Sequence, residues 1–171
     1  SIFIIVDDKI QYVNRALLEL SGYDKKELIG EPFLKFIAPE ERENVTKHYY
    51  KRVKGKKAPW SYESVAVIKS GEQFPVEISV LPVVYKGKKG FQVICHDISK
   101  RKKAENELIR SRQEWEAIFQ ASGQPTMLVS PDHTILSVNK ATKDLTGLDE
   151  KELIGKKCFE ILHGTKEPPE G

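Results

Sequence analysis

Cysteine has the widest chemistry of the residues in this sequence, since a thiol can form a disulfide, bind a metal ion or act as a nucleophile. The chain has two, Cys95 and Cys158, which stand in different halves and form no Cys-x-x-Cys pair. This spacing gives neither a disulfide framework nor a zinc site. Free thiols are typical of a reducing compartment, so we expect a cytoplasmic protein. No metal site is expected, and no catalytic residues are expected because no catalytic constellation is found elsewhere in the sequence.

The composition is that of a globular protein with little net charge. Of the 171 residues, 39% are hydrophobic and 31% are charged, and the formal net charge is +3. This is enough apolar material for a core and too much charge for a membrane protein. Basic clusters at residues 54–57, 86–89 and 100–103 are typical of solvated turns and helix ends. We therefore expect no nucleic-acid partner.

The apolar stretches are short. Residues 2–6 and 76–84 are the longest, well below the roughly 20 residues that a membrane span requires, and no signal-peptide pattern is present. We expect no membrane insertion by this segment. Ser1 leads straight into an apolar run without an initiator Met. This indicates a piece of a longer protein and leaves open a membrane anchor elsewhere in the parent.

A repeat organises the sequence. Val-Asn-Arg-Ala at residues 13–16 returns as Val-Asn-Lys-Ala at 138–141, and the segment 21–30 returns at 146–155. Every counterpart pair is 125 positions apart, since residue 139 corresponds to residue 14. Upstream the copies differ by two residues in a turn, where changes of length are best tolerated.

Each copy begins with signals of local structure. Apolar runs at residues 2–6 and 10–13 indicate a hairpin. Asn14 follows it and can cap a helix that Gly22 ends. Asp24, with Glu three positions later, begins a second short helix through a capping box. The second copy has the same signals.

The first copy continues with helical segments expected at residues 33–37 and 39–53, after which the apolar period changes to two. Strands are predicted at residues 60–68, 74–85 and 91–98, joined by glycine-containing turns. The order is two strands, four helical segments and three strands. It predicts an α+β domain with its helices grouped on one side of an antiparallel sheet.

These segments together resemble the PAS domain family. The resemblance rests on residues 13–16 and 22–30, on Lys-Ser-Gly-Glu-Gln-Phe-Pro-Val-Glu-Ile-Ser at 69–79, and on Asp-Ile-Ser at 97–99. It implies a PAS fold, in which a five-stranded antiparallel sheet of order 2-1-5-4-3 is closed on one face by helices over a small pocket. It is similar to the tandem PAS region of a prokaryotic sensor histidine kinase or a related signalling protein.

Three parts are predicted. Residues 1–99 form the first PAS domain, complete apart from any N-terminal flanking helix, and residues 100–122 form a helical signalling linker. Residues 123–171 form the N-terminal part of a second PAS domain. This copy stops around Pro-Pro-Glu-Gly at 168–171, before its last three strands, so we expect it to be incomplete within this sequence.

Catalysis is expected outside this chain. The phosphoacceptor of a histidine kinase is a His followed by acidic, apolar, basic and Pro or Leu positions, and no histidine of the sequence has these neighbours. The four are His48, His96, His133 and His163. The chain has no glycine-rich nucleotide lid either. We expect no enzyme activity in this chain and a sensor histidine kinase, part of a two-component phosphorelay, in the parent.

Haem and flavin are not expected. Alignment with haem-binding relatives places Thr46 at their ligand position, and His48 lies about 200° further round the helix. Flavin-binding light sensors of the family use Cys in Gly-x-Asn-Cys-Arg-Phe-Leu-Gln, where the first copy has Phe33. Cys158 of the second copy lacks the neighbouring Asn, Arg and Gln. We interpret both cysteines as apolar core residues.

A small organic ligand is left open. The candidate pocket of the first domain has aromatic and aliphatic walls with a few hydroxyls, which suits such a molecule. Its candidate residues are Phe33, Phe36, Ile37, Tyr49, Trp60, Tyr62, Ile78, Val80, Phe91 and Val93. The same residues would equally form a plain PAS core, and the sequence does not identify a ligand.

The linker carries the candidate relay. No Gly or Pro interrupts it, so it predicts one helix. Spacings of 4, 3, 4, 3 and 4 form an imperfect heptad seam of Ala104, Leu108, Ser111, Trp115, Ile118 and Ser122. The seam favours a weak parallel coiled-coil homodimer; alternatively, Leu108, Trp115, Ile118 and Phe119 pack on a PAS sheet. The candidate relay residues are Asp97, Ile98, Ser99, Leu108, Trp115 and Ile118.

Two functions follow from this reading. In the first, the chain is a sensory module that detects a small ligand or partner and relays the signal through the linker helix. The receiver is a downstream output domain of the same parent chain, expected to be a histidine kinase. In the second, the chain is a ligand-free dimerisation and relay module whose input comes from a neighbouring domain.

Overall fold

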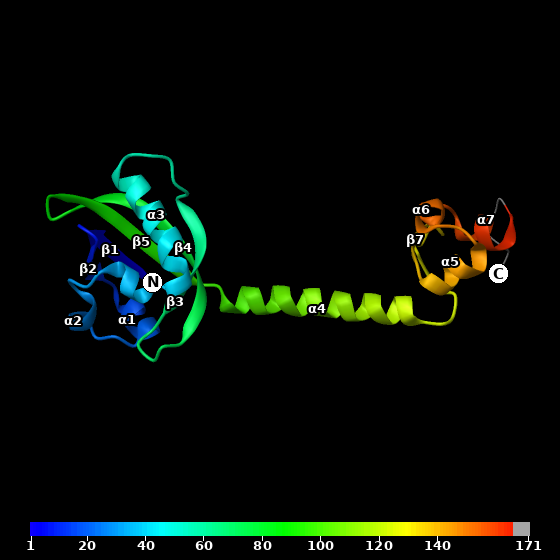
Figure 1. Ribbon diagram of the computed structural model, residues 1–171, viewed down its shortest axis with the longest axis horizontal. Coiled ribbons are helices and arrows are strands. Elements are labelled where there is room, and N and C mark those ends of the chain that lie inside the picture. Colours follow the sequence, from blue (N-terminus) through cyan, green and yellow to red (C-terminus); the bar gives the residue numbers. More distant parts are fainter. Residues whose placement is uncertain (166–171) are drawn as a thin grey trace. The chain divides into compact units, whose positions relative to one another are not determined.

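The computed structural model describes residues 1–165 and divides into two compact units, Ser1–Glu105 and a second that begins at Asn106 (Figure 1). The predicted end of the second copy, at residues 168–171, lies outside the described part of the chain. Across residues 1–165, no helix combines the length and apolar character that crossing a membrane requires. Within the same range, no group of three or more His, Cys, Asp or Glu side chains is arranged to hold a metal ion.

A five-stranded antiparallel sheet forms the first unit. Its strands are β1 (Ile2–Val6), β2 (Lys9–Val13), β3 (Ser61–Val67), β4 (Gln73–Tyr85) and β5 (Lys88–Asp97). Their order is β2-β1-β5-β4-β3, which confirms the order that the PAS resemblance implied. The last strand is therefore the central one, hydrogen-bonded to β1 on one side and to β4 on the other.

The segment between β2 and β3 is helical. It forms α1 (Arg15–Ser21), α2 (Lys25–Leu28), the 3₁₀ turns η1 (Phe33–Phe36) and η2 (Pro39–Glu41), and α3 (Arg42–Val53). The single helix predicted over residues 39–53 is thus a 3₁₀ turn followed by an α-helix. Proline is well suited to such a first turn because its ring fixes φ and it has no N–H to leave unpaired.

The predicted helix signals of the first copy are confirmed. The Asn14 side chain accepts a hydrogen bond from the Leu17 N–H at 3.0 Å, and Gly22 ends α1 in the left-handed conformation with φ of 69°. Asp24 and Glu27 form the predicted capping box at the start of α2. These features depend on residues within four positions of one another, which is why the sequence predicts them well.

The hairpin between β4 and β5 is tighter than predicted. A turn over residues 86–90 and a strand from residue 91 were expected, whereas β5 begins at Lys88 after the two-residue turn Lys86-Gly87. Gly90 lies inside the strand, where an added Cβ would collide with the carbonyl oxygen of Ile5. The absence of a side chain at this position lets β5 approach β1 closely. Gly90 is therefore part of the strand and not part of the predicted turn.

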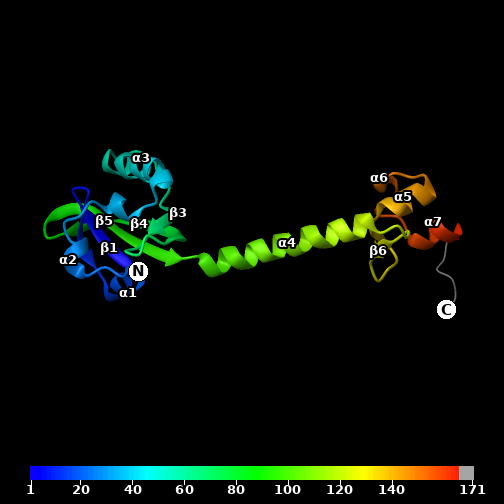
Figure 2. The ribbon, with the colours of Figure 1, turned by 60° about the horizontal axis from the view of Figure 1, so that its bottom comes forward.

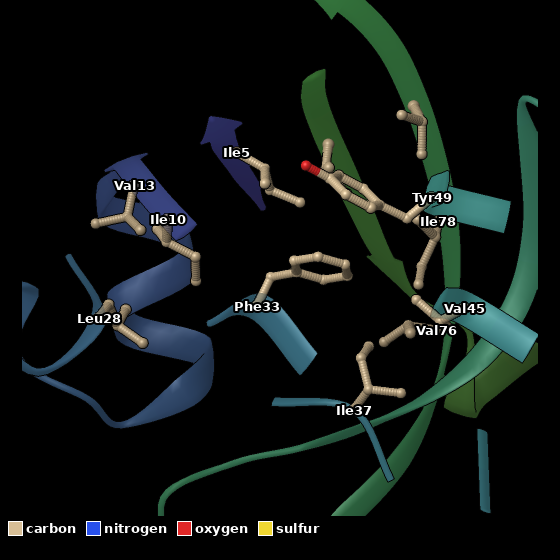
Figure 3. Packing of buried hydrophobic residues seen from close by; sticks show 12 residues of the cluster. Ile5, Ile10, Val13, Leu28, Phe33, Ile37, Val45, Tyr49, Val76 and Ile78 are labelled. Carbon is tan, nitrogen blue, oxygen red and sulfur yellow. The ribbon is translucent and has the colours of Figure 1, made fainter. Parts of the chain in front are cut away.

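The core of the first unit lies between the inner face of the sheet and the helices. β4 contributes Val76, Ile78 and Val80, each at most 4% exposed, so its predicted alternation is confirmed. Figure 3 shows Phe33 projecting from η1 into this core. Its ring centroid lies 5.0 Å from that of Tyr49 on α3, so the short 3₁₀ turn and the long helix meet over the sheet.

The linker and the second copy form further elements: α4 (Ser99–Ala121), β6 (Met127–Val129), β7 (Ile135–Val138), α5 (Lys140–Thr146), α6 (Glu150–Leu153) and α7 (Cys158–His163). α4 is one unbroken helix, as predicted, and belongs in part to each unit. β6 and β7 form a two-stranded antiparallel sheet. A small core of Ile135, Val138 and Leu153 lies beneath it, and Cys158 packs against this core as interpreted from the sequence.

Candidate ligand cavity and relay segment

A cavity of about 80 Å³ lies inside the first unit, between the inner face of the sheet and the helical segment. Nine of the ten predicted pocket residues line it. They are Phe33, Phe36, Ile37, Tyr49, Tyr62, Ile78, Val80, Phe91 and Val93. They come from η1 and the residue after it, from α3 and from three strands, so the fold gathers residues that are up to 60 positions apart around one space.

Trp60 is the exception and corrects the prediction. Its side chain is 54% exposed, and it does not line the cavity. Trp60 lies one residue before β3, which begins at Ser61, but its carbonyl still accepts from the Val80 N–H at 2.8 Å, so the pairing with β4 continues to it. Its indole contacts the Arg52 guanidinium at 5.9 Å, as the Tyr62 ring does at 5.4 Å, and of these two rings Tyr62 reaches the cavity.

The cavity has further walls that the candidate residues omitted. β1 and β2 contribute Phe3, Ile5 and Ile10. Because β1 pairs with β5 at the middle of the sheet, these residues face the same space as Phe91 and Val93, more than 80 positions later in the chain. The continuous apolar run at residues 2–6 was the available signal, since such a run is typical of a fully buried strand.

Arg52 is the functional candidate that sequence reasoning missed. It lies in the last turn of α3, is only 9% exposed, and lines the cavity. One Nη donates to the carbonyl of Pro59, whereas Nε has no hydrogen-bond partner among residues 1–165. Arg52 follows the buried residues Tyr49 and Val45 by three and seven positions, so it lies on the inner face of the helix. This spacing is the sequence signal that could have identified it.

Two other polar atoms are buried beside α3 without a partner in the described structure, His48 Nδ1 and Ser64 Oγ. The His48 ring packs edge-on against Tyr62, with centroids 4.8 Å apart. Burial, and then the nearby Arg52 charge, lower the pKa of His48, so the imidazole is neutral at physiological pH. His48 and Ser64 lie outside the cavity lining, whereas their neighbours Arg52 and Tyr62 are part of it.

The hydroxyls and the thiol of the cavity wall are all un-ionised. Burial raises the pKa of Tyr49 to about 12, helped by the Asp8 carboxylate, and the Tyr49 hydroxyl accepts from the Asp8 N–H at 3.2 Å. Burial also raises the pKa of Tyr62. The pKa of Cys95 rises to about 12 for the same reason, so its thiol is not a nucleophile at neutral pH.

Three of the six predicted relay residues, Asp97, Ile98 and Ser99, lie where β5 joins α4 (Figure 2). The Asp97 carboxylate accepts from the Ser99 N–H at 2.8 Å, capping the helix start, and hydrogen bonds from Ser99 lower the pKa of Asp97. Ile98 is 6% exposed, and its N–H donates to the Pro75 carbonyl of β4 at 3.1 Å. The beginning of α4 is thus attached to the sheet by both backbone and side chain.

Glu63 adds a second attachment that sequence reasoning missed. From β3 it pairs with Arg101 at 3.0 Å and with Lys102 at 2.6 Å, both in the first turn of α4. The hydrogen bond from Lys102 is the main reason that the pKa of Glu63 is lowered. Each pair is exposed and contributes little stability on its own, but together they link the edge strand to the helix.

Further along α4, the apolar residues of the predicted seam are exposed, and one residue beside the seam is buried. Leu108 and Ile118 are each 72% exposed and Trp115 is 46% exposed, whereas Phe119 is 8% exposed and stacks on Trp115. The alternative in which all four pack on a PAS sheet is therefore wrong for Leu108, Trp115 and Ile118, and of the four only Phe119 is buried. The seam lies open along one helix face, and the homodimer stays a prediction.

Family models match both copies. The PAS domain model matches residues 1–100 and the PAS fold model matches residues 113–168. The chain belongs to the PAS domain family. The repeat seen in the sequence is thus a repeat of PAS copies, and the first unit is a PAS sensor domain.

Two curated signalling proteins are similar in sequence. The chain is 26% identical to sporulation kinase A of Bacillus subtilis (strain 168) over 94% of its own length, and spans 26% of that protein. It is 32% identical to the methyl sulfide methyltransferase-associated sensor of Methanosarcina acetivorans over 61% of its length, and spans 10% of that protein. The likeness supports a signalling role for the PAS region.

Solved structures share the fold. The PAS domain of a protein from Colwellia psychrerythraea has a TM-score of 0.51 at 24% identity, and the match covers 58% of this chain and 86% of that one. An RNA-binding light-oxygen-voltage receptor has a TM-score of 0.52 at 17% identity, covering 68% of this chain and 34% of that one. At these identities the likeness shows the fold alone.

Proposed function

We propose that the chain is the sensory part of a larger cytoplasmic signalling protein. The first unit detects a small organic molecule and α4 relays the event to an output domain, a histidine kinase, elsewhere in the parent. One observation carries the proposal: an apolar cavity lies against the central strand β5, and that strand runs directly into α4. The likeness to sporulation kinase A supports the choice of output.

The relay follows from how β5 is held. Phe91, Val93 and Cys95 of β5 line the cavity, and α4 begins four residues after Cys95. A molecule that enters the cavity displaces these side chains, while Glu63 continues to hold the first turn of α4 to β3. A shift of β5 relative to β3 therefore changes how α4 leaves the sheet. Binding favours the position of β5, shifted or unshifted relative to β3, that accommodates the ligand better.

Native mass spectrometry combined with thermal shift against a metabolite library tests ligand detection. We expect a reproducible adduct of a small organic molecule that raises the melting temperature of the first unit. We expect no haem or flavin, so the purified protein should be colourless. A Soret band that survives gel filtration, or a flavin spectrum, would contradict this cofactor assignment.

Insertions into α4 test the relay in the full-length parent. One residue inserted after Arg112 rotates everything downstream by about 100° and should invert or abolish output, whereas seven residues restore the heptad register and should largely restore output. Identical output from the two insertions, with the protein folded, would leave α4 as a tether.

The second candidate function is ligand-free dimerisation and relay, and the exposed seam favours it. Leu108 and Ile118 are each 72% exposed on the helix face where the heptad spacing places them. Sedimentation should show a concentration-dependent homodimer that Ile118→Glu dissociates. Ile109→Glu is the matched control, because Ile109 is 54% exposed and lies outside the seam. Failure to find an adduct in any expression host, together with such a dimer, would favour this function over ligand detection.

A further inference from the structure

Arg52 gives the cavity a positive charge. Among the described residues that line it, the other polar side chains are uncharged: Ser21, Tyr49, Tyr62 and Cys95. None of the ion pairs formed within residues 1–165 includes Arg52. The cavity wall thus presents one cation and no anion.

A buried guanidinium needs compensation, because it stays protonated at physiological pH and loses the hydration it would have in water. Here the compensation is the Pro59 carbonyl and the faces of two rings, those of Tyr62 at 5.4 Å and Trp60 at 5.9 Å. The N–H at Nε has no described partner. Carboxylates and phosphates match a guanidinium in geometry and charge, and of the two the less strongly charged carboxylate suits a cavity with one cation and apolar walls.

Arg52 also lies where the cavity meets the surface. Tyr49, Arg52 and Phe91 line both the cavity and a groove that opens to solvent beside the β1–β2 and β4–β5 turns. These three side chains therefore form the wall between the groove and the interior. A molecule that entered this way would keep a charged end at Arg52 and place its apolar end against the core.

Acidic side chains of the groove do not neutralise Arg52, because other groups bind them. The Asp8 carboxylate accepts from the Tyr50 hydroxyl at 2.9 Å, and Asp7 pairs with Lys88 at 3.2 Å. Lys89 also lines the groove and adds positive charge. The local charge therefore favours an anion.

We propose that the ligand is a small organic carboxylate with an apolar body, and that its carboxylate binds Arg52. The proposal rests on the proposed function, since it requires that the cavity take a ligand. The cavity volume of about 80 Å³ corresponds to roughly five to eight water positions. This suits an acid of the size of benzoate or a branched short-chain fatty acid. The apolar walls around Phe33 and Val76 bind the body of the molecule.

Calorimetric titration of the whole chain tests the class of ligand. The probes are benzoate, phenylacetate, isovalerate and hexanoate, each paired with its neutral amide. At least one acid should bind and its amide should bind at least tenfold more weakly. Arg52→Gln should weaken the acid by about 10- to 100-fold, the range for one charge-assisted hydrogen bond. In the wild-type protein, the NMR signal of the Arg52 Nε–H should shift on binding.

Two variants keep the test decisive. Lys51→Gln removes the neighbouring charge, which lies outside the cavity lining, and should leave affinity unchanged. Ala66→Leu fills the cavity while keeping Arg52, and should abolish binding even if Arg52→Gln does not fold. Equal affinity for acid and amide, or hits that are all neutral molecules, would overturn the carboxylate assignment and leave ligand detection standing. Absence of binding by every acid, amide and library compound would overturn both.

Discussion

Asn14 and Asn139 occupy the same position in the two PAS copies, and each caps a helix by accepting a backbone N–H three residues later at 3.0 Å. Their surroundings differ. Asn14 is half-buried, whereas Asn139 is 0% exposed and its amide donates to the carbonyls of Gln124 at 2.8 Å and Ser122 at 3.3 Å. The same short motif therefore forms the same helix cap in both copies. The segment that precedes each hairpin decides which further hydrogen bonds the asparagine side chain makes.

The hairpins of the two copies differ in the same way. In the first copy β1 is hydrogen-bonded to both β2 and β5 and lies over a core that extends to α3 and β4. In the second copy β6 and β7 pair with each other in a two-stranded sheet, with Leu128 47% and Leu136 50% exposed. A hairpin derives most of its stability from what packs on it, so equivalent local sequences should differ in stability.

Of the variants considered, Gly90→Ala should change the relative stability of the two units most, by destabilising the first one. The added methyl collides with the Ile5 carbonyl, a backbone atom that cannot move without separating β1 from β5, so we expect the first unit to lose about 3 kcal/mol. NMR signals of the second unit should be unchanged. Urea unfolding followed by residue-resolved NMR measures both.

Gly123→Ala is the matched control, because nothing lies within 4 Å of its added Cβ. A first unit that keeps its stability after Gly90→Ala would show that the contact between β1 and β5 is looser than described.

Aspartate substitutions sharpen the comparison between the two asparagines. Asn14→Asp keeps an acceptor for the helix N–H groups and should change stability by at most about 0.5 kcal/mol. Asn139→Asp loses both amide donations in a fully buried site, so it should cost the second unit about 2 kcal/mol or more. Urea unfolding of the two variants gives the difference, and equal effects would contradict the assigned role of the Asn139 amide.

Hydrogen exchange compares the hairpins directly. Amides in residues 127–138 should exchange at least tenfold faster than those in residues 2–13, which corresponds to about 1.4 kcal/mol less protection. The measurement is made on the whole chain at a concentration at which sedimentation shows a monomer. Equal protection in that monomer would mean that the second hairpin is stabilised by contacts beyond those described.

The smallest expected effect concerns Glu27 and its pH dependence. Glu27 caps α2 as Glu152 caps α6, but it also pairs with Lys69 at 2.7 Å, from the turn after β3. The hydrogen bond from Lys69 is the main reason that the pKa of Glu27 lies below its usual 4.5. The stabilising contribution is therefore fully present above about pH 4.5 and is lost as the pH falls through the lower, folded-state pKa.

Lys69→Ala should return the pKa of Glu27 toward 4.5, as measured by NMR titration of its carboxyl carbon. Lys26→Ala, which removes a lysine of α2 that forms no ion pair with Glu27 among the described residues, is the control and should leave the pKa of Glu27 nearly unchanged. A Glu27 pKa that does not move in Lys69→Ala would show that the capping interaction with Asp24, and not the ion pair, lowers it.

The sequence by itself determined the features that depend on near neighbours. Asn14, Gly22 and Asp24 predicted the helix boundaries because capping involves atoms within four residues. The two-residue period predicted the inward face of β4, and together the motifs identified the PAS family and so the strand order. Nine of the residues that line the cavity could be predicted in this way, since aromatic and aliphatic residues on inward faces converge in this fold.

Tertiary structure decided what depends on where strands start and which strands lie side by side. Trp60 was predicted inside and lies outside the cavity, where its indole contacts the Arg52 guanidinium. Arg52 lines the cavity because α3 turns its inner face to β3, and Gly90 belongs to a strand because β1 lies against it. Glu63 reaches Arg101 across 38 residues. Such contacts depend on strand register and helix orientation, which a local pattern of residue types does not specify.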